Sequence, residues 1–254
     1  MDLGLKGKVA LVTGGGSGIG GGISEYLACE GVNVAVNYIV DKPAVEAFVE
    51  KLNEKYGTEC IAVYADVSKA DDLDTMLKEV AGKLGAVEIL VNNAGVWPTE
   101  NAVEMDDSRW ERVIDINLNG PYMLSKRVVN KMVEAGKKGV IVNLSSKSAF
   151  QYNTGGHAHY ATAKAGINML TRSMAREVSA DGIRVVAIAP GMVRTPMNED
   201  KWSQDGMEDY YIKRIPVGKL TEPIEVGYLV AFLASGKAAN ITGSVVDITG
   251  GMLI

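Results

Sequence analysis

A tyrosine and a lysine four residues apart, Tyr160 and Lys164 in the sequence YATAK, form the pair best suited to acid–base chemistry. Residues at positions i and i+4 of a helix lie on the same face, one turn apart. A tyrosine hydroxyl alone titrates near pH ~10, but a neighbouring ammonium favours the phenolate and lowers that pKa. The pair could therefore transfer a proton at neutral pH. By itself, however, the spacing is more often that of a half-buried tyrosine beside a solvated lysine.

A glycine-rich turn lies between the first apolar run and the helical pattern that follows it. Its sequence over residues 14–20 is GGGSGIG. Glycines let the backbone turn tightly and approach a pyrophosphate, whose charge is stabilised by N–H groups at the start of a helix. No Gly-Lys-Ser/Thr follows, which excludes a P-loop. The turn predicts a dinucleotide site, and proton transfer beside hydride transfer is alcohol–ketone chemistry.

Short Val/Ile-rich runs alternate with helical patterns along the whole chain. The expected strands are residues 9–13, 33–38, 60–66, 89–92, 139–145, 184–189 and 244–248. The expected helices are residues 19–30, 43–56, 70–84, 108–136, 160–181 and 224–235, with a break or kink at Gly120-Pro121. Runs without polar alternation are typical of parallel strands buried on both faces. We expect an α/β fold, a Rossmann-type doubly wound sheet of about seven mostly parallel strands with helices on both faces.

The organisation of the chain indicates one domain over residues 1–254, because no linker, repeat or low-complexity tract interrupts it. The least regular stretch, at about 195–217, is too long for an ordinary connection and predicts a lid or substrate-facing insertion.

Composition limits the partners and the compartment. A net charge of −5 without any concentration of Lys and Arg excludes nucleic acid as a partner. No stretch approaches the ~20 apolar residues of a membrane span, and the N-terminus lacks a signal-peptide pattern. The two cysteines and two histidines lack metal-ligand spacing, so we expect free thiols, no metal site and a cytoplasmic protein.

Four motifs, which include the glycine turn and the Tyr–Lys pair, follow one another along the chain. They are TGGGSGIG at 13–20, NNAG at 92–95, YATAK at 160–164 and PGMVRT at 190–195. With them, the chain resembles the short-chain dehydrogenase/reductase family from about residue 6 to the C-terminus. The resemblance implies an NAD(P)-dependent oxidoreductase that interconverts a secondary alcohol and a ketone.

The resemblance also implies catalytic roles. Tyr160 would be the acid/base, and Lys164 would lower its pKa and bind the nicotinamide ribose. Ser146, the last residue of VNLSS, would hold the substrate oxygen as an oxyanion-hole donor. It lies 14 residues before Tyr160, one more than is common in the family, so Ser145 and Ser148 stay alternatives.

Asn117, in IDINLNG, matches the family's asparagine that interrupts a helix and positions a water in the proton relay behind the lysine. The expected cofactor-binding residues are Gly14, Ser17, Gly18, Ile19, Gly20, Asn37, Tyr38, Asp66, Val67, Asn93, Ala94, Gly95, Tyr160, Lys164, Pro190, Gly191, Val193 and Thr195. Among them, Asp66-Val67 would contact the adenine, although Asp66 could also cap the next helix, and Thr195 would bind the carboxamide. Asn92 is expected to tie neighbouring strands instead.

Cofactor choice depends on the end of the second expected strand. NAD-specific relatives place an acid there, where this chain has Tyr38. Basic residues frequent in NADP users are absent too, because Ser17 and Ile39 are uncharged and Lys42 is the only nearby cation. Asn37-Tyr38 resembles the NADP users, so NADP(H) is favoured modestly over NAD(H).

The substrate is expected to be a free small-molecule alcohol or ketone. Reduction of 3-oxoacyl groups on acyl carrier protein is the alternative, but of two basic positions near the site Lys137 fits one and Asp181 occupies the other. A non-catalytic, nucleotide-sensing or scaffold relative is a remote alternative, because the four expected catalytic residues are all present. Relatives are usually tetramers, so we expect a homotetramer with interfaces on the 108–136 helices and the C-terminal segment.

Overall fold

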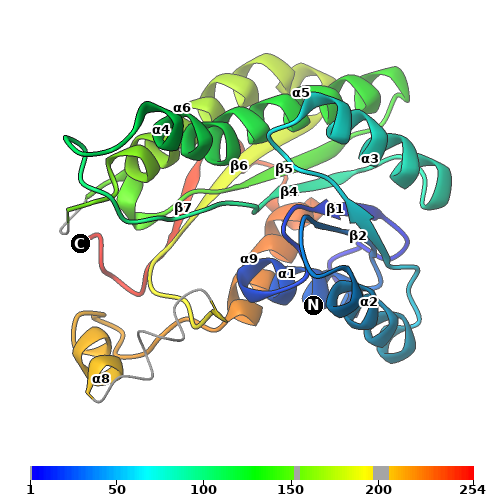
Figure 1. Cartoon of the computed structure of the whole chain (residues 1–254). Helices are drawn as coiled ribbons and strands as arrows, with labels where there is room; N and C mark the ends of the chain where they lie inside the picture. Colours follow the sequence, from blue (N-terminus) through cyan, green and yellow to red (C-terminus); the bar gives the residue numbers. More distant parts are fainter. Residues whose placement is uncertain (1, 152–154, 197–205) are drawn as a thin grey trace.

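The computed structural model describes residues 2–151, 155–196 and 206–254. Its sheet has seven strands in the order β3-β2-β1-β4-β5-β6-β7 (Figure 1). Every neighbouring pair is parallel. The strands are β1 Val9–Val12, β2 Asn33–Tyr38, β3 Ile61–Tyr64, β4 Ile89–Asn92, β5 Gly139–Leu144, β6 Ile183–Pro190 and β7 Val245–Ile248. The chain order reverses between β1 and β4, and such switch points are where open α/β sheets bind ligands.

Helices cover both faces of this sheet, as Figure 1 shows. On one face lie α1 Gly18–Cys29, α2 Lys42–Tyr56 and α9 Pro223–Ala234, and on the other α3 Ala70–Lys83, α4 Asp107–Ile114, α5 Gly120–Glu134 and α6 Ala158–Val178. Successive strand residues point to opposite faces, so Ala10 and Val12 pack with the first set while Val9 and Leu11 pack with the second. The expected doubly wound α/β fold is confirmed.

The expected break at Gly120-Pro121 is displaced by a few residues. α4 and α5 are joined by a π-helical segment, Asp115–Asn119, and no kink separates Gly120 from Pro121. Pro121 lies in the first turn of α5, where a missing backbone N–H costs least. Gly120 is required by packing, because a Cβ there would lie 2.8 Å from the Val67 carbonyl oxygen. The irregular segment carries Asn117.

Side-chain caps and a left-handed glycine determine where three of the helices begin or end. α9 begins with a capping box, in which the Glu225 carboxylate accepts a hydrogen bond from the Glu222 N–H (2.8 Å). The Asp41 carboxylate accepts the Ala44 N–H at the start of α2. α6 continues through a 3₁₀ turn, Ser179–Asp181, which ends at Gly182 with a left-handed φ of 74°. That glycine therefore ends the helix where the sequence predicted.

Shorter helical segments connect the main elements. They are the 3₁₀ turns Lys147–Ala149 and Gly236–Ala238 and the helix α8 Met207–Ile212. α8 falls within the stretch 195–217, expected to be an insertion, and Figure 1 places it away from the helical layers. Residues 197–205 of that stretch lie outside the described residues.

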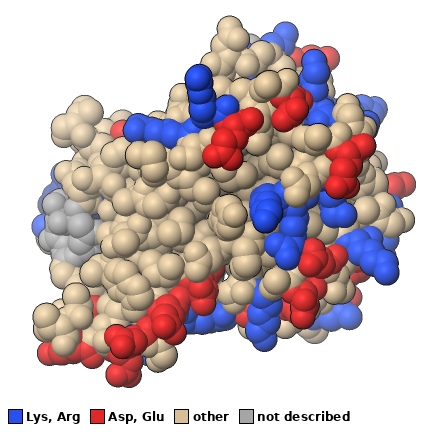
Figure 2. Space-filling model, turned by 90° about the horizontal axis from the view of Figure 1, so that it is seen from above, with Lys and Arg blue, Asp and Glu red and all other residues tan. Residues whose placement is uncertain are grey.

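The face formed by α4, α5 and α6 carries both signs of charge. Figure 2 shows Lys and Arg interspersed with Asp and Glu toward its edges, around a broad area that has neither. Within the described ranges, no helix is both long and apolar enough to cross a bilayer, and no cluster of three His, Cys, Asp or Glu side chains could hold a metal ion.

Candidate active site

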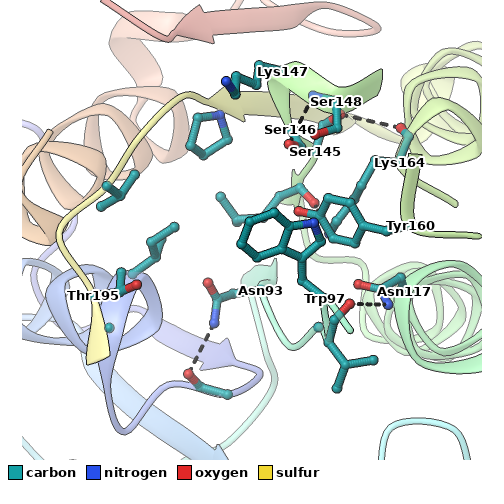
Figure 3. Close-up of a pocket in the computed structure, with 18 of the residues that line it drawn as sticks. Asn93, Trp97, Asn117, Ser145, Ser146, Lys147, Ser148, Tyr160, Lys164 and Thr195 are labelled. Carbon is teal, nitrogen blue, oxygen red and sulfur yellow. Dashed lines mark hydrogen bonds between the residues drawn. The ribbon is translucent and has the colours of Figure 1, made fainter. Parts of the chain in front are cut away.

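A cavity of about 390 Å³ opens at the carboxyl ends of the strands, at the switch point between β1 and β4 (Figure 3). Its walls come from the loops after β1, β4, β5 and β6, from α6 and from α8. The predicted site residues that line it are Gly14, Ser17, Gly18, Ile19, Asn93, Ala94, Gly95, Asn117, Ser146, Tyr160, Lys164, Pro190, Gly191, Val193 and Thr195. The fold therefore brings together residues that span most of the chain.

Tyr160 and Lys164 lie in the first turns of α6, as the spacing predicted. Lys164 is 5% exposed, and its Nζ donates a hydrogen bond to the Leu144 carbonyl oxygen (2.7 Å). The same Nζ lies 5.6 Å from the centre of the Tyr160 ring. Burial lowers the pKa of Lys164 to about 8, so the ammonium is still mostly charged at neutral pH. A buried cation is thus held close to the tyrosine ring.

The three serines after β5 differ in their surroundings. The Ser145 hydroxyl donates to Asn168 Oδ1 (2.6 Å) and to the Lys164 carbonyl oxygen (3.4 Å). The Ser146 hydroxyl oxygen accepts the Ser148 N–H (3.1 Å), which leaves its own proton available to a ligand. All three serines line the cavity. The interactions of Ser145 are those of a positioning residue, and they favour Ser146 as the substrate contact.

A chain of buried polar side chains fixes β4 and β5 beneath the site. Asn92 Nδ2 donates to Ser125 Oγ (2.9 Å) and to Asn143 Oδ1 (2.8 Å). Asn143 Nδ2 in turn donates to Thr171 Oγ1 on α6 (2.9 Å). Buried polar groups that are satisfied in this way specify one arrangement. The expected strand-tying role of Asn92 is confirmed, and the network couples the serine segment to the helix of Tyr160.

The glycine turn is held by neighbouring strands. The Gly14 N–H donates to Asn37 Oδ1 (3.2 Å), and Asn93 Nδ2 donates to the Thr13 and Gly14 carbonyl oxygens (2.9 and 3.1 Å). Gly14 has a φ of 58°, a left-handed conformation that favours glycine. A Cβ on Gly20 would lie 2.1 Å from the Gly14 carbonyl oxygen. The turn is therefore shaped by close backbone packing.

Five predicted cofactor residues lie outside the lining of this cavity: Gly20, Asn37, Tyr38, Asp66 and Val67. The Asn37 amide donates to the Val63 and Ala65 carbonyl oxygens (3.4 and 3.1 Å), in addition to its bond with the turn. Tyr38 packs edge-on against Tyr64, with ring centres 5.9 Å apart. The Asn37 side chain therefore positions the turn, and a direct cofactor contact for these five residues stays a prediction.

Asp66 is almost buried and engaged within the chain. Burial alone would raise the pKa of its carboxyl, but hydrogen bonds from Ser68 and the ion pair with Arg112 (3.1 Å) outweigh it and lower the pKa. The Asp66 N–H donates to Asp72 Oδ2 (2.9 Å). Asp66 therefore orders the segment that leads into α3.

Several residues of the cavity were not among the predicted site residues. They include Leu144, Lys147 and Met192, whereas Trp97, Pro196 and Tyr211 belong to the segments 96–100 and 195–217 that the sequence places at the substrate pocket. Trp97 stacks on His157, with ring centres 4.6 Å apart, and so closes one side of the cavity. Adjacency to the serine pattern was a usable signal for Lys147. Tyr211 comes from the irregular stretch, where the sequence has no periodicity to place it.

The fold and this cavity define a dinucleotide-binding α/β protein, and comparison with known proteins defines its family. A family model described as "Enoyl-(Acyl carrier protein) reductase" matches residues 14–253. The chain is 40% identical to the 3-oxoacyl-[acyl-carrier-protein] reductase FabG of Staphylococcus epidermidis, over 96% of this chain and 98% of that protein. It is 36% identical to 3beta-hydroxysteroid dehydrogenase 1 of Eggerthella lenta, over 98% and 95% respectively.

Solved structures agree with the sequence relatives. A putative gluconate dehydrogenase from Agrobacterium tumefaciens superposes with a TM-score of 0.92 at 32% identity, over 98% of this chain and 97% of that one. The chain belongs to the short-chain dehydrogenase/reductase family, and it is an oxidoreductase of that family. The expected family is confirmed.

The cavity fits the nicotinamide dinucleotide that this family implies. The backbone at Gly14 and Gly18 has positive φ, so the turn presents its N–H groups at the start of α1 without intervening side chains. Asn117 Oδ1 is buried with no hydrogen-bond partner among the described residues, and a Cβ on Gly95 would lie only 2.7 Å from it. Gly95 therefore packs closely against Oδ1, an acceptor that the described residues leave unsatisfied and that belongs to a residue lining the cavity.

Proposed function

We propose that Tyr160 is the acid/base of an alcohol–ketone oxidoreductase. It would give a proton to the ketone oxygen in reduction and take it back in oxidation, while the Ser146 hydroxyl holds that oxygen. The observation that carries the proposal is the buried Lys164 ammonium beside the Tyr160 ring, because that charge favours the phenolate. When bound, the nicotinamide would supply or accept the hydride.

The side chain of Asn117 is proposed to serve the proton path behind Lys164. Its Nδ2 donates to the Val96 and Val113 carbonyl oxygens (both 3.0 Å), which fixes the orientation of the amide. The remaining acceptor, Oδ1, would hold a water that exchanges protons with the site.

Replacing Tyr160 with Phe tests the proposal most directly. The variant loses only a hydroxyl, so dinucleotide binding should stay intact while kcat falls by about 10²–10⁴-fold. Cofactor titration and steady-state turnover with a ketone panel measure the two effects. Tyr122→Phe, which removes the hydroxyl of an exposed tyrosine on α5, is the matched control. Near-full activity of Tyr160→Phe would disprove the role.

For the dinucleotide, we propose NADP(H) over NAD(H). The only acid between Asn37 and Lys42 is Asp41, and its carboxylate caps α2 instead of standing at the end of β2. An NAD-specific site would use such a carboxylate for the ribose 2′-hydroxyl. Turnover with each cofactor at equal concentration tests this choice.

For the substrate, we propose a free small-molecule ketone or alcohol. Lys137, the one basic residue at the expected carrier-docking positions, is paired with Glu88 (3.5 Å), and Asp181 sits at the other position. The alternative, 3-oxoacyl-[acyl-carrier-protein] reduction, is favoured by the 40% identity to the staphylococcal enzyme. Comparing kcat/KM for a carrier-bound 3-oxoacyl thioester with that for free ketones decides between them.

We also propose a cytoplasmic homotetramer. Cys29 and Cys60 are unpaired thiols, which suits a reducing compartment. Exposed apolar side chains on α5, α6 and α9 support association with further copies of the chain.

A further inference from the structure

Lys147 is a cation of the cavity to which the proposed chemistry assigns no task. It directly follows Ser146, begins the 3₁₀ turn Lys147–Ala149 and lines the same cavity. Figure 3 shows its side chain at the rim, across the opening from Asn93. Because the Ser146 hydroxyl caps this turn through the Ser148 N–H, the backbone keeps Lys147 next to the proposed oxygen-binding position.

The surroundings of Lys147 disfavour its charge. Partial burial lowers the pKa of Lys147, and the nearby Arg214 guanidinium lowers it further. Within the described part of the chain, no acid forms an ion pair with either cation, and no Asp or Glu lines the cavity. The two cations repel each other, and an anion bound at Lys147 would relieve that repulsion.

Arg214 approaches from the opposite segment. Tyr211 of α8 lines the cavity, and the Arg214 N–H donates to the Tyr211 carbonyl oxygen (3.0 Å), which continues the helical turn. The guanidinium of Arg214 lies 3.9 Å from the centre of the Tyr210 ring, a cation–π contact that orders its side chain. Lys147 thus lines the cavity after β5, while Arg214 follows the α8 segment whose Tyr211 lines the cavity.

We propose that the substrate is a small oxo acid or hydroxy acid whose carboxylate binds Lys147 while its reacting oxygen contacts Ser146 and Tyr160. This inference rests on the proposed function and narrows its substrate class. A carboxylate suits the site because it accepts a charge-assisted hydrogen bond from the Lys147 ammonium. Losing one such bond should weaken binding by about tenfold to a hundredfold.

Binding of non-reacting acids to the enzyme–cofactor complex tests the site without turnover. The probes are butanoate, pentanoate and hexanoate against their amides, measured by calorimetry. At least one acid should bind wild type about tenfold or more tightly than its amide. Lys147→Met, which keeps the length of the side chain but removes its charge, should abolish that difference. Lys213→Met, an exposed lysine beside Arg214, should retain it.

Equal binding of acids and amides by wild type would overturn the proposal, as would an unchanged preference in Lys147→Met. Turnover gives an independent measure, the ratio of kcat/KM for acetoacetate to that for ethyl acetoacetate, which should fall by a similar factor in Lys147→Met. If wild type reduces neutral ketones but shows no preference for acids, only this inference fails. If it reduces neither acids nor neutral ketones, the proposed function fails, while the binding result still reports on the cation pair.

A carrier-bound substrate would bring a different anion, the phosphate of its phosphopantetheine arm. Acetoacetyl-pantetheine with and without the 4′-phosphate separates the two cases. A Lys147-dependent gain from the phosphate, without any preference for free carboxylates, would assign the cations to the carrier arm and overturn the oxo-acid proposal.

Discussion

At the scale of single residues, the charge of Lys164 limits the pH range of the reaction. Burial lowers its pKa from 10.5 to about 8, so the ammonium is charged below that pH and neutral above it. Reduction needs a protonated Tyr160 and a nearby cation. We therefore expect kcat/KM for reduction to fall as pH rises through about 8, measured in profiles from about pH 6 to about pH 10.

The control for this prediction is Lys164→Met, which has no ammonium to lose. Its residual activity should be low and should decline only near pH ~10, where an unperturbed tyrosine titrates. A wild-type profile that stays flat up to pH ~10 would contradict the assignment of the charge to Lys164.

The two neighbouring serines should separate catalysis from stability. Ser146→Ala removes the proposed donor to the substrate oxygen and should lower kcat by about 10²–10³-fold. Ser145→Ala leaves Asn168 without its hydrogen-bond donor, so it should lower the free energy of unfolding by about 1–3 kcal/mol with a small effect on kcat. Steady-state kinetics and urea unfolding of both variants measure the two quantities. The reverse pattern would make Ser145 the catalytic serine.

At the scale of elements, regular structure could be predicted where local pattern and global fold agree. β2 and β4 have the expected bounds, because their Val/Ile-rich runs are buried on both faces and end at polar residues. The π-helical segment Asp115–Asn119 could not be predicted from periodicity, although the family resemblance implied that Asn117 interrupts a helix. Gly120 beside it packs against the Val67 carbonyl oxygen, a contact distant in sequence. α8 has too few residues for a periodic signal.

The residues of the site likewise divide into those that the sequence could predict and those that it could not. The predicted residues that line the cavity mostly follow a strand end or belong to the Tyr–Lys pair, so a fixed fold and a fixed cofactor determine their types. Lys147 and Tyr211 face the substrate side, whose residue types depend on a molecule that the motifs do not specify. The sequence motifs therefore specify the class of reaction more closely than the class of substrate.

The close contact between α1 and α9 explains why two helical positions, Gly22 and Gly227, are glycines. A Cβ on Gly22 would lie 2.4 Å from the Pro223 carbonyl carbon, and one on Gly227 would lie 2.7 Å from the Gly22 carbonyl oxygen. Gly22→Ala should therefore force the helices apart and lower the free energy of unfolding by about 1–3 kcal/mol. Urea denaturation measures this change.

Gly82→Ala is the control for that experiment. Gly82 lies in α3 without a positive φ, and a Cβ added there would meet no neighbouring element within 4 Å. Alanine at this position should therefore stabilise the helix by about 0.5–1 kcal/mol. If Gly22→Ala is as stable as wild type, backbone contact does not set the spacing of α1 and α9.

At the scale of the whole molecule, the distribution of apolar side chains indicates surfaces that further copies would cover. Tyr122 on α5 and Met169 on α6 are 46% and 59% exposed, and Figure 2 shows the weakly charged area on the face that these helices form. Tyr228 and Phe232 on α9 are also exposed, and they lie across the sheet from that face. Two separate apolar surfaces allow two kinds of contact, and a closed tetramer with dihedral symmetry needs at least two.

We therefore expect light scattering of the purified protein to give a mass near four times 27.0 kDa. Met169→Glu places a charge on the α5–α6 face, and because burying an unpaired carboxylate is costly, it should reduce the assembly to dimers that use the other surface. Val103→Glu, at a 95% exposed position outside the helices, should leave the mass unchanged. A wild-type protein that is monomeric at ~10 µM, a concentration at which obligate oligomers stay assembled, would show that these apolar faces are not interfaces. A Met169→Glu tetramer would instead move the contact to another part of the chain.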